Sequence, residues 1–186
     1  REDVKNLAAT IKKLTERTIG KKCDDAKAAK RLFDYIDKLP SSCSMWRLRL
    51  FALAQCPQVF KNELRNSFLK VFDVGERYFE IEGGAEYKQA LIRGFGALDP
   101  KTEQREYVKK VFEYFGADLV DKDKKKWREQ DGINILSCIK GHLTLDEKKR
   151  AKEKFNISVD DTSYVPEPTI GEMRGGAIIH RSPVNL

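Results

Sequence analysis

Residues 60–72, with the sequence FKNELRNSFLKVF, decide the fold class. The apolar side chains of this stretch recur at intervals of three or four positions: Phe60, Leu64, Phe68, Val71 and Phe72. That spacing places them on one face of an α-helix, whereas a half-buried strand would alternate apolar and polar residues with a period of two. The stretch therefore predicts a long amphipathic helix with a strongly aromatic inner face.

We expect this helix to begin near Pro57, a residue suited to the first helical turn, and to extend toward Phe79. Working outward, the same periodicity predicts helices over residues 2–18, 24–39, 86–98 and 99–119. Residues 43–55 are apolar on much of the helix circumference, which predicts a central buried helix. A further helix holding residues 135–139 is expected to follow the basic run 121–128. Thr144 and Glu147 form a capping-box pattern, which predicts a last helix ending near Phe155.

The fold class follows from these segments. Before residue 156, only the short stretch 78–81 alternates with a period of two. We therefore predict an all-α, single-domain bundle or layered array of seven to eight helices in residues 1–158. Residues 159–186 contain three prolines and three glycines, so we expect them to form an extended tail that either docks on the body, acts as an exchange arm or stays mobile.

Length and composition limit the class of protein. The 186 residues are 40% hydrophobic and 35% charged, with a formal net charge of +7. A chain of this length can bury a sizeable core without a metal ion or dense disulfides. The sequence holds no run of 18 apolar residues, so we predict no membrane insertion.

Four cysteines raise the question of the redox compartment. Cys23, Cys43, Cys56 and Cys138 include no CxxC pair, which favours two disulfides or free core thiols over a zinc site. If Cys43 and Cys56 share one helix, they lie about 20 Å apart and cannot bond to each other. We favour the pairs Cys23–Cys43 and Cys56–Cys138; the alternative is that the cysteines are small buried residues in a reducing compartment.

Localisation follows from the cysteines and two weaker signals. The sequence begins at Arg1, from which we expect that any targeting segment has been removed. Asn156-Ile157-Ser158 is a glycosylation sequon, which predicts a glycan on Asn156. Together with the even number of cysteines, these signals predict a secreted protein, with a cytoplasmic location as the alternative.

Catalytic motifs are nearly absent from the sequence. The two histidines, His142 and His180, have no visible partner for a Ser/His/Asp or Cys/His site. The Gly94-Phe95-Gly96 pattern follows no strand and lacks the third glycine of a dinucleotide fingerprint. We therefore predict a protein that is not an enzyme and has neither a metal site nor a cofactor.

Charge is the most uneven feature of the sequence. The basic run 121–128 and the segment 140–154 each carry a net charge of +3. Lysine and arginine can bind phosphates and other anions, and an embedded tryptophan can supply a stacking face. The alternative is a solvated lysine-rich helix face with Trp127 turned into the core. The candidate partner-binding residues are Lys122, Lys124, Lys125, Lys126, Trp127, Arg128, Lys140, Lys148, Lys149, Arg150 and Lys152.

These observations predict a secreted, disulfide-containing basic helical protein that binds a protein or an anionic polysaccharide through its C-terminal helices. The first alternative is an intracellular or viral nucleic-acid-binding protein, whose tail serves as an oligomerisation arm. The second is a carrier of a small apolar ligand between helices. The expected walls of that interior pocket are Phe68, Phe72, Phe95, Phe112 and Phe115. The sequence does not define an oligomeric state.

Overall fold

The computed structural model describes residues 2–39, 43–74 and 84–162, except for the side chains of residues 2–9, 43, 44 and 74. Eight α-helices and three short 3-10 helices occupy most of these residues, and no strand occurs among them. The all-α prediction is confirmed. The α-helices are α1 (Glu2–Thr18), α2 (Ala26–Asp37), α3 (Cys43–Leu53), α4 (Lys61–Val74), α6 (Gly84–Gly94), α7 (Glu103–Phe115), α8 (Lys122–Cys138) and α9 (Leu145–Phe155).

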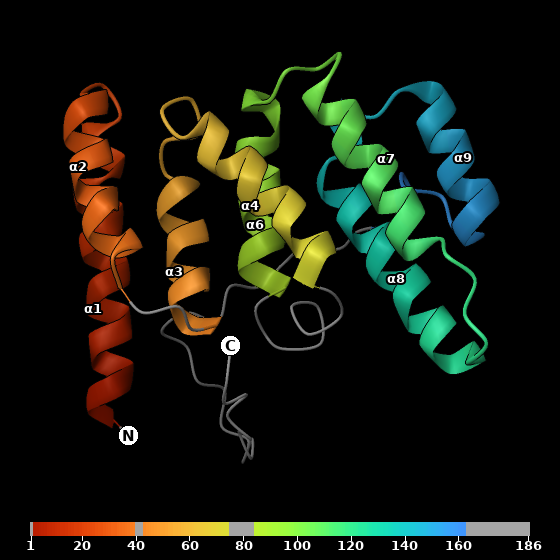
Figure 1. The fold of residues 1–186 in the computed structure, drawn as a ribbon, viewed down its shortest axis with the longest axis horizontal. Coiled ribbons are helices and arrows are strands. Elements are labelled where there is room, and N and C mark those ends of the chain that lie inside the picture. Colours follow the sequence, from red (N-terminus) through yellow and green to blue (C-terminus); the bar gives the residue numbers. More distant parts are fainter. Residues whose placement is uncertain (1, 40–42, 75–83, 163–186) are drawn as a thin grey trace.

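The helices stand in a row that follows the chain from one end of the molecule to the other (Figure 1). The helices α1 and α2 lie at one end and pack against α3, which packs in turn against α6. The next layer is formed by α4 and α6, and α7 and α8 follow it. At the far end, α9 packs against α8. Of the two arrangements expected, the molecule adopts the layered array.

Three short 3-10 helices join these layers. They are η1 (Gly20–Lys22) between α1 and α2, η2 (Phe95–Ala97) after α6, and η3 (Lys140–His142) after α8. None of the helices in the described part of the chain is long and apolar enough to cross a membrane.

Two helices begin four residues later than the sequence predicts. α4 begins four residues after Pro57, because the amides of Val59 and Phe60 both donate to the carbonyl oxygen of Cys56 and close a turn first. α7 begins at Glu103, because the Asp99 side chain accepts hydrogen bonds from the backbone amides of Lys101 and Thr102. That local turn competes with the helix for the same backbone donors. Phe79, the expected limit of the fourth helix, lies outside the described residues.

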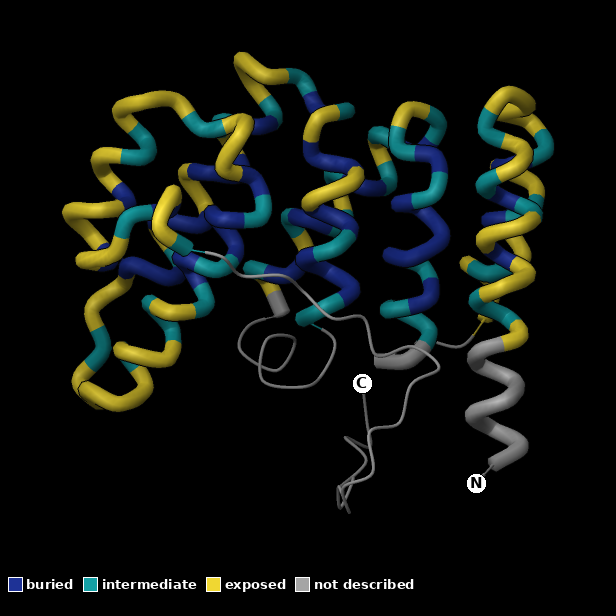
Figure 2. The backbone as a smooth tube through the Cα atoms, turned by 180° about the vertical axis from the view of Figure 1, so that it is seen from behind, coloured by how far each residue is buried: buried dark blue, intermediate teal, exposed yellow. Residues whose placement is uncertain are grey.

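Aromatic side chains fill the middle of the array. The rings of Phe68 and Phe95 both pack against Tyr107, and Phe68 also packs against Tyr87. The Tyr87 hydroxyl donates to the carbonyl oxygen of Phe68 at 3.0 Å and therefore accepts from the Tyr107 hydroxyl at 2.8 Å. Burial raises the pKa of both tyrosines. Each buried hydroxyl thus has a partner, and Figure 2 shows how burial is concentrated between the layers.

Charged side chains also connect the layers. The Arg47 guanidinium of α3 makes two hydrogen bonds, of 2.7 and 2.9 Å, to the buried carboxylate of Glu86 in α6. Lys88 in α6 pairs with Asp131 in α8 at 3.3 Å. A buried charge is tolerated only when a partner compensates it, so these pairs fix the register of α6 against both neighbours.

The first residues of the expected tail pack on the helical body. Val159 is buried in the core, and Lys148 of α9 pairs with Asp160 at 2.9 Å. The Thr162 hydroxyl donates to the carbonyl oxygen of Ser158. Residues 163–186, which make up the rest of the expected tail, lie outside the described residues.

Candidate functional site

The first two turns of α8 carry the basic run. The Asp121 side chain caps the helix by accepting hydrogen bonds from the backbone amides of Asp123 and Lys124, at 3.0 and 3.1 Å. A cap satisfies amides that have no partner within the helix. The expectation that a helix follows the basic run is therefore wrong. The capping residue precedes the lysines, so the basic run forms the first turns of α8 itself.

Trp127 points away from the core and is 77% exposed. It stands five positions before the buried Gly132, and at about 100° per residue the two lie about 140° apart around the helix axis. Gly132, Ile135 and Leu136 form the buried side of α8. The alternative in which Trp127 turns into the core does not occur.

Three lysines accompany Trp127 on the exposed part of α8. Lys122, Lys124 and Lys126 are exposed, and none of them makes an ion pair with any residue that the structure describes. We call Lys122, Lys124, Lys126 and Trp127 the α8 surface. It combines an accessible indole with three lysines that make no ion pair within the described part of the chain. These residues surround the exposed start of α8 rather than forming one stripe, because positions two apart lie about 160° apart around the helix axis.

Two other predicted residues of α8 serve its packing. Lys125 pairs with Asp118 in the preceding loop at 2.8 Å. The Arg128 guanidinium lies over the ring of Tyr114 in α7, 4.1 Å from the ring centroid. These two side chains hold the start of α8 against its neighbours, so they are less available to a partner than the α8 surface.

The predicted residues of α9 are divided in the same way. Lys148 pairs with Asp160, and the Arg150 guanidinium lies 4.5 Å from the ring centroid of Phe112. Lys149 approaches Glu153 at 4.0 Å, one turn along the helix. These contacts commit Lys148 and Arg150 to the fold, while Lys149 keeps only an exposed pair.

The last two predicted residues differ in position. Lys152 is exposed on α9 and makes no ion pair within the described part of the chain. Lys140 lies in η3, beyond the C-terminal end of α8, about 25 Å along the helix from Lys122. The structure therefore separates Lys140 from the α8 surface.

The loop between α7 and α8 brings the end of α9 near the start of α8. Atoms of Lys154 lie close to Gly116, where an added Cβ would come within 2.6 Å of the Lys154 Cε. The hydrogen bond from Lys125, together with the charges of Lys125 and Lys154, lowers the pKa of Asp118. Lys154 belongs to the basic segment 140–154 but not to the candidate partner-binding residues, and it connects the basic start of α8 with the end of α9.

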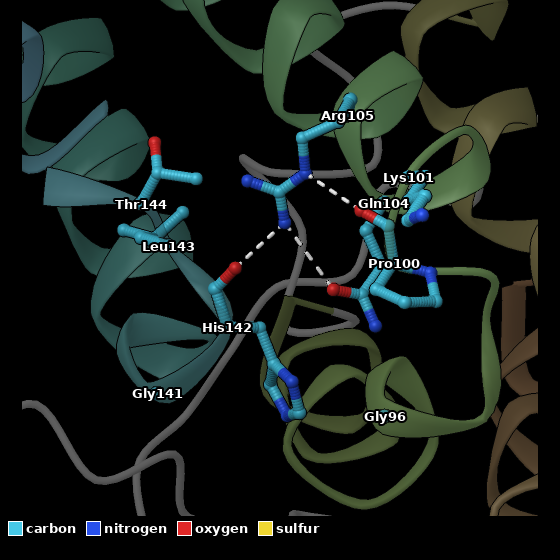
Figure 3. Close-up of a pocket in the computed structure, with 9 residues that line it drawn as sticks. All are labelled: Gly96, Pro100, Lys101, Gln104, Arg105, Gly141, His142, Leu143 and Thr144. Carbon is cyan, nitrogen blue, oxygen red and sulfur yellow. Dashed lines mark hydrogen bonds between the residues drawn. The ribbon is translucent and has the colours of Figure 1, made fainter. Parts of the chain in front are cut away.

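An open cleft of about 670 Å³ lies between the starts of α7 and α9 (Figure 3). Arg105 crosses it, donating to the carbonyl oxygens of Pro100 and His142 and to the side chains of Gln104 and Glu147. Its guanidinium is therefore engaged in joining α7 to η3 and α9. The lining residues are Gly96, Pro100, Lys101, Gln104, Arg105, Gly141, His142, Leu143 and Thr144.

The two helix starts beside this cleft differ in their capping: α9 has a side-chain cap, whereas Thr102 at the start of α7 makes no side-chain cap hydrogen bond. Thr144 and Glu147 form the predicted capping box of α9, which is confirmed. The backbone amide of Asp99 donates to Glu103, and this hydrogen bond lowers the pKa of the Glu103 carboxyl. At the start of α9, the Glu147 carboxylate accepts from the Thr144 amide and thus occupies a position at which an anion would otherwise bind. The cleft connects helices and offers little to an anionic ligand.

The phenylalanines predicted to line an interior pocket belong to the hydrophobic core and its edge, and none of them lines the cleft: Phe68, Phe72, Phe95, Phe112 and Phe115. His142 lies against one of them, with its ring centroid 5.6 Å from that of Phe95. His180 lies outside the described residues. In that described part, no three His, Cys, Asp or Glu side chains gather in a way that could hold a metal ion.

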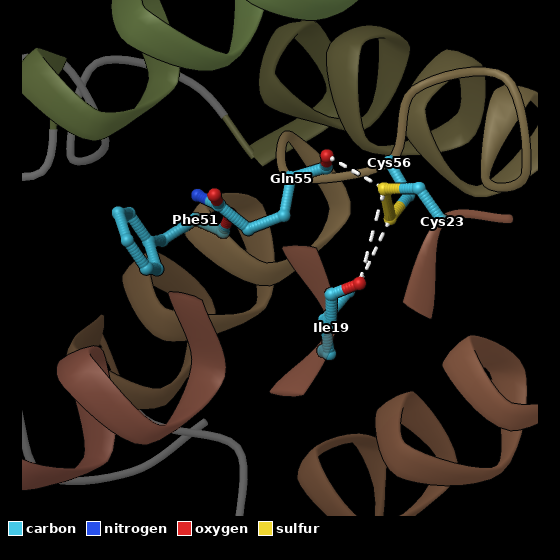
Figure 4. Close-up of a disulfide and its surroundings, with 5 residues drawn as sticks. All are labelled: Ile19, Cys23, Phe51, Gln55 and Cys56. Atoms are coloured by element: carbon cyan, nitrogen blue, oxygen red, sulfur yellow. Dashed lines mark hydrogen bonds between the residues drawn. A yellow bond between two sulfur atoms is a disulfide. The ribbon is translucent and has the colours of Figure 1, made fainter. Parts of the chain in front are cut away.

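Cys23 and Cys56 stand in disulfide geometry, with their Cα atoms 5.4 Å apart (Figure 4). The favoured pairing of Cys23 with Cys43 and of Cys56 with Cys138 is therefore wrong. Cys56 lies just after α3 and contacts the residues before η1, since its sulfur is 3.2 Å from the Ile19 carbonyl oxygen. Helix periodicity does not predict this pairing of cysteines, because it depends on how two layers of helices pack together.

The other two cysteines differ from that pair. Cys138 is a free thiol that donates to the Asn134 carbonyl oxygen at 3.2 Å, and burial raises its pKa to about 11. Cys43 is the first residue of α3, and its side chain is not described.

Asn156 is exposed at the C-terminal end of α9 and has φ 55° and ψ 21°. Among non-glycine residues, asparagine adopts this left-handed conformation most readily. The helix end alone therefore accounts for an asparagine here, and the predicted glycan remains a prediction.

Sequence reasoning also missed an exposed aromatic residue at the other end of the array. Tyr35 on α2 is 72% exposed, with Arg31 four positions before it and Lys38 three positions after it. That spacing places the three side chains on one face of the helix. The pattern was visible in the sequence as cations at helical intervals around a tyrosine.

The molecule is thus a layered all-α protein with exposed basic and aromatic residues at both ends of its helical array. Comparisons with protein-family models, curated proteins and solved structures found no match to this chain.

Proposed function

We propose that this protein is a non-enzymatic binding protein that engages an anionic macromolecule through the α8 surface. One observation carries the proposal: Trp127 is 77% exposed on the same helical turns as three lysines that make no ion pair with any described carboxylate. Trp is among the most effective residues at interfaces, because it buries a large rigid surface at a low cost in conformational entropy.

Electrostatics supports an anionic partner. The protein has a net charge of +7, and unpaired lysines on one helix raise the local concentration of an anionic polymer and release its counterions on binding. Lys125 and Arg128 hold α8 in place through Asp118 and Tyr114, so the lysines of the α8 surface stand on a fixed scaffold. Binding then requires little rearrangement of the helix.

We propose an acidic protein surface or an anionic polysaccharide as the partner, outside the cell. The Cys23–Cys56 pair supports that location, because disulfides persist in oxidising compartments. Nucleic acid is the second candidate, in a cytoplasmic setting, and a specific observation favours it. An exposed indole beside lysines offers a base a stacking surface and its phosphate a counterion.

The experiment measures the affinity of the full chain for a labelled heparin fragment and for a labelled oligothymidylate over a range of salt concentrations. In the test variant, Lys122, Lys124 and Lys126 are replaced by Glu. In the control variant, the exposed Lys70, Lys101 and Lys110 of other elements are replaced by Glu, which changes the net charge equally.

We expect the α8 variant to lose at least about tenfold in affinity at low salt, and the control to lose much less. Three phosphate contacts to a single strand contribute about −2 to the slope of log affinity against log salt. The α8 variant should lose that contribution. Equal losses in both variants, or binding that ignores salt, would contradict the proposal.

Substitution of Trp127 separates stacking from charge. Trp127→Ala should weaken oligothymidylate binding by roughly 5- to 150-fold, which corresponds to about 1–3 kcal/mol for one stacked base. Because the side chain is exposed, the free energy of unfolding should change by less than about 0.5 kcal/mol. Unchanged affinity for both ligands would remove Trp127 from the proposed surface.

A further inference from the structure

The outer face of α2 carries a second group of cations around an aromatic ring. Lys27, Arg31, Tyr35 and Lys38 are all exposed and follow one another at intervals of three or four positions. They therefore form one stripe along the helix. The core-facing side of α2 is marked instead by the buried Ala29. We call these four residues the α2 surface.

The cations of the α2 surface are not neutralised by described residues. None of Lys27, Arg31 and Lys38 makes an ion pair within the described part of the chain. Of the nearby acids on α2, Asp37 pairs with Arg49 of α3 at 3.1 Å, and Asp34 is exposed. Asp24 and Asp25, just before α2, are exposed as well, so residues 21–38 hold six cations and four carboxylates, a net charge of +2.

The aromatic ring at the centre of this stripe is accessible. Tyr35 is 72% exposed, and the Lys38 ammonium lies 5.9 Å from the ring centroid. The preceding 3-10 helix η1 adds the exposed Lys21 and Lys22 at the end of α2 where Lys27 lies. The exposed Asp24 and Asp25 lie between these two lysines and Lys27, so the cations that accompany Tyr35 along α2 itself are Lys27, Arg31 and Lys38.

The same chemistry thus occurs at two separate places in the array. The α2 surface and the α8 surface each place an exposed aromatic ring among lysines or arginines without carboxylate partners. Figure 1 shows α2 at one end of the row of helices and α8 in the layer next to α9 at the other end. Different elements build the two surfaces, so each can bind without the other.

We infer that the α2 surface is a second binding site of this protein and that it binds single-stranded nucleic acid. A flat ring with a cation about one helical turn away on each side matches a base with its flanking phosphates. Base stacking on aromatic rings tolerates any sequence, and cations beside the ring follow the backbone. A duplex keeps its bases stacked inside, so it would use only the charges.

The inference uses residues different from those of the α8 surface and rests on the proposed function only for the anionic character of the partner. A strand long enough to reach both surfaces would gain affinity from the second contact, because that contact forms at a high effective concentration. Two separated single-strand sites thus suit a long, flexible polymer better than a compact partner.

The experiment counts how many oligothymidylates of about 8 nucleotides bind one full chain, by native mass spectrometry at low salt. The α2 variant carries Arg31→Glu, Tyr35→Ser and Lys38→Glu, and the α8 variant is that of the proposed function. A control carries Lys70→Glu and Lys110→Glu, which matches the change in charge of the α2 variant. Ultraviolet cross-linking of the unmodified protein identifies the contacted peptides, independently of how the variants fold.

We expect two oligonucleotides per chain for the unmodified protein and the control, and one for each surface variant. Cross-links should map to the peptides of both Tyr35 and Trp127. One oligonucleotide that only the α8 variant loses would overturn the inference and leave the proposed function standing. One that only the α2 variant loses would support the inference and remove nucleic acid as a ligand of the α8 surface. Absence of binding would overturn the inference together with the nucleic-acid candidate of the proposed function, whose polysaccharide candidate is tested by the heparin titration. Equal binding of a duplex of the same length would overturn the single-strand assignment.

Discussion

Reduction of the Cys23–Cys56 bond should destabilise the protein by an amount that the structure sets. The two cysteines are 33 residues apart in the sequence. Closing a loop of that length removes about 12.5 cal/mol/K of entropy from the unfolded chain, which gives about 3.7 kcal/mol at 25 °C. For a protein of this size, that loss is a large part of the expected free energy of unfolding.

The folded state itself should tolerate reduction. The Cys56 sulfur lies 3.2 Å from the Ile19 carbonyl oxygen, and the Cys23 sulfur lies 3.2 Å from that of Gln55 (Figure 4). In the reduced protein each thiol therefore has an acceptor for its hydrogen. The predicted loss comes from the greater freedom of the unfolded chain, and the helical content at zero denaturant should stay the same.

Urea unfolding with and without reductant, followed by circular dichroism, measures this effect. The control is a Cys138→Ser variant, whose stability should respond to reductant as the unmodified protein does. Peptide mapping of the oxidised protein should recover Cys23 joined to Cys56. If reduction of the bonded protein lowers the free energy of unfolding by less than about 1 kcal/mol, the entropic argument is refuted. If peptide mapping finds Cys56 bonded to Cys138, the packing of η1 against the end of α3 is refuted.

Further predictions concern packing and protonation. Gly132→Ala should lower the free energy of unfolding by about 1–2 kcal/mol, because the added Cβ would lie 2.7 Å from the Cβ of a core phenylalanine. This overpacking outweighs the higher helix propensity of alanine. Gly141→Ala, which meets open space, should change the free energy of unfolding by less than about 0.5 kcal/mol in the same urea assay. Burial raises the Cys138 pKa to about 11, so iodoacetamide at pH 8 should alkylate this thiol roughly 100-fold more slowly than a model thiol, by mass spectrometry. Hydrogen bonds lower the pKa of Asp99 and Asp118 in the folded state, so their stabilisation is present above the ordinary aspartate pKa of about 4 and is lost as pH falls below it. Thermal unfolding from pH 6 down to pH 2 should therefore show a falling midpoint, and a flat midpoint would contradict this assignment.

The helices were predictable because their signal is local. Apolar residues at helical spacing identified α1 and α4, apolar residues around much of the circumference identified α3, and the Thr144–Glu147 pattern marked the start of α9. The starts of α4 and α7 were misplaced because single side-chain or turn hydrogen bonds decided them. Such hydrogen bonds compete with the backbone hydrogen bonds of the first helical turn, and the spacing of apolar residues does not locate a helix boundary within a few residues.

The candidate site was partly accessible to the same reasoning. The α8 lysines and Trp127 were identified, and the outward direction of Trp127 follows from its distance of five residues to the buried Gly132. The disulfide partner of Cys56 was not accessible, because it depends on η1 meeting the end of α3. Tyr35 and its cations were visible in the sequence, but their exposure depends on α2 lying at the end of the array.

The most direct test of the α8 surface uses the fluorescence of the protein's two tryptophans. Trp46 stacks on Tyr87 at 6.1 Å between ring centroids, whereas Trp127 is exposed, so replacing Trp127 by Phe leaves only the packed indole. Titration with oligothymidylate should quench the emission of the unmodified protein, and the Trp127→Phe variant should lose that quenching. The same quenching in the variant, or none in the unmodified protein at saturation, would contradict the assignment of the α8 surface as a binding site for this class of partner.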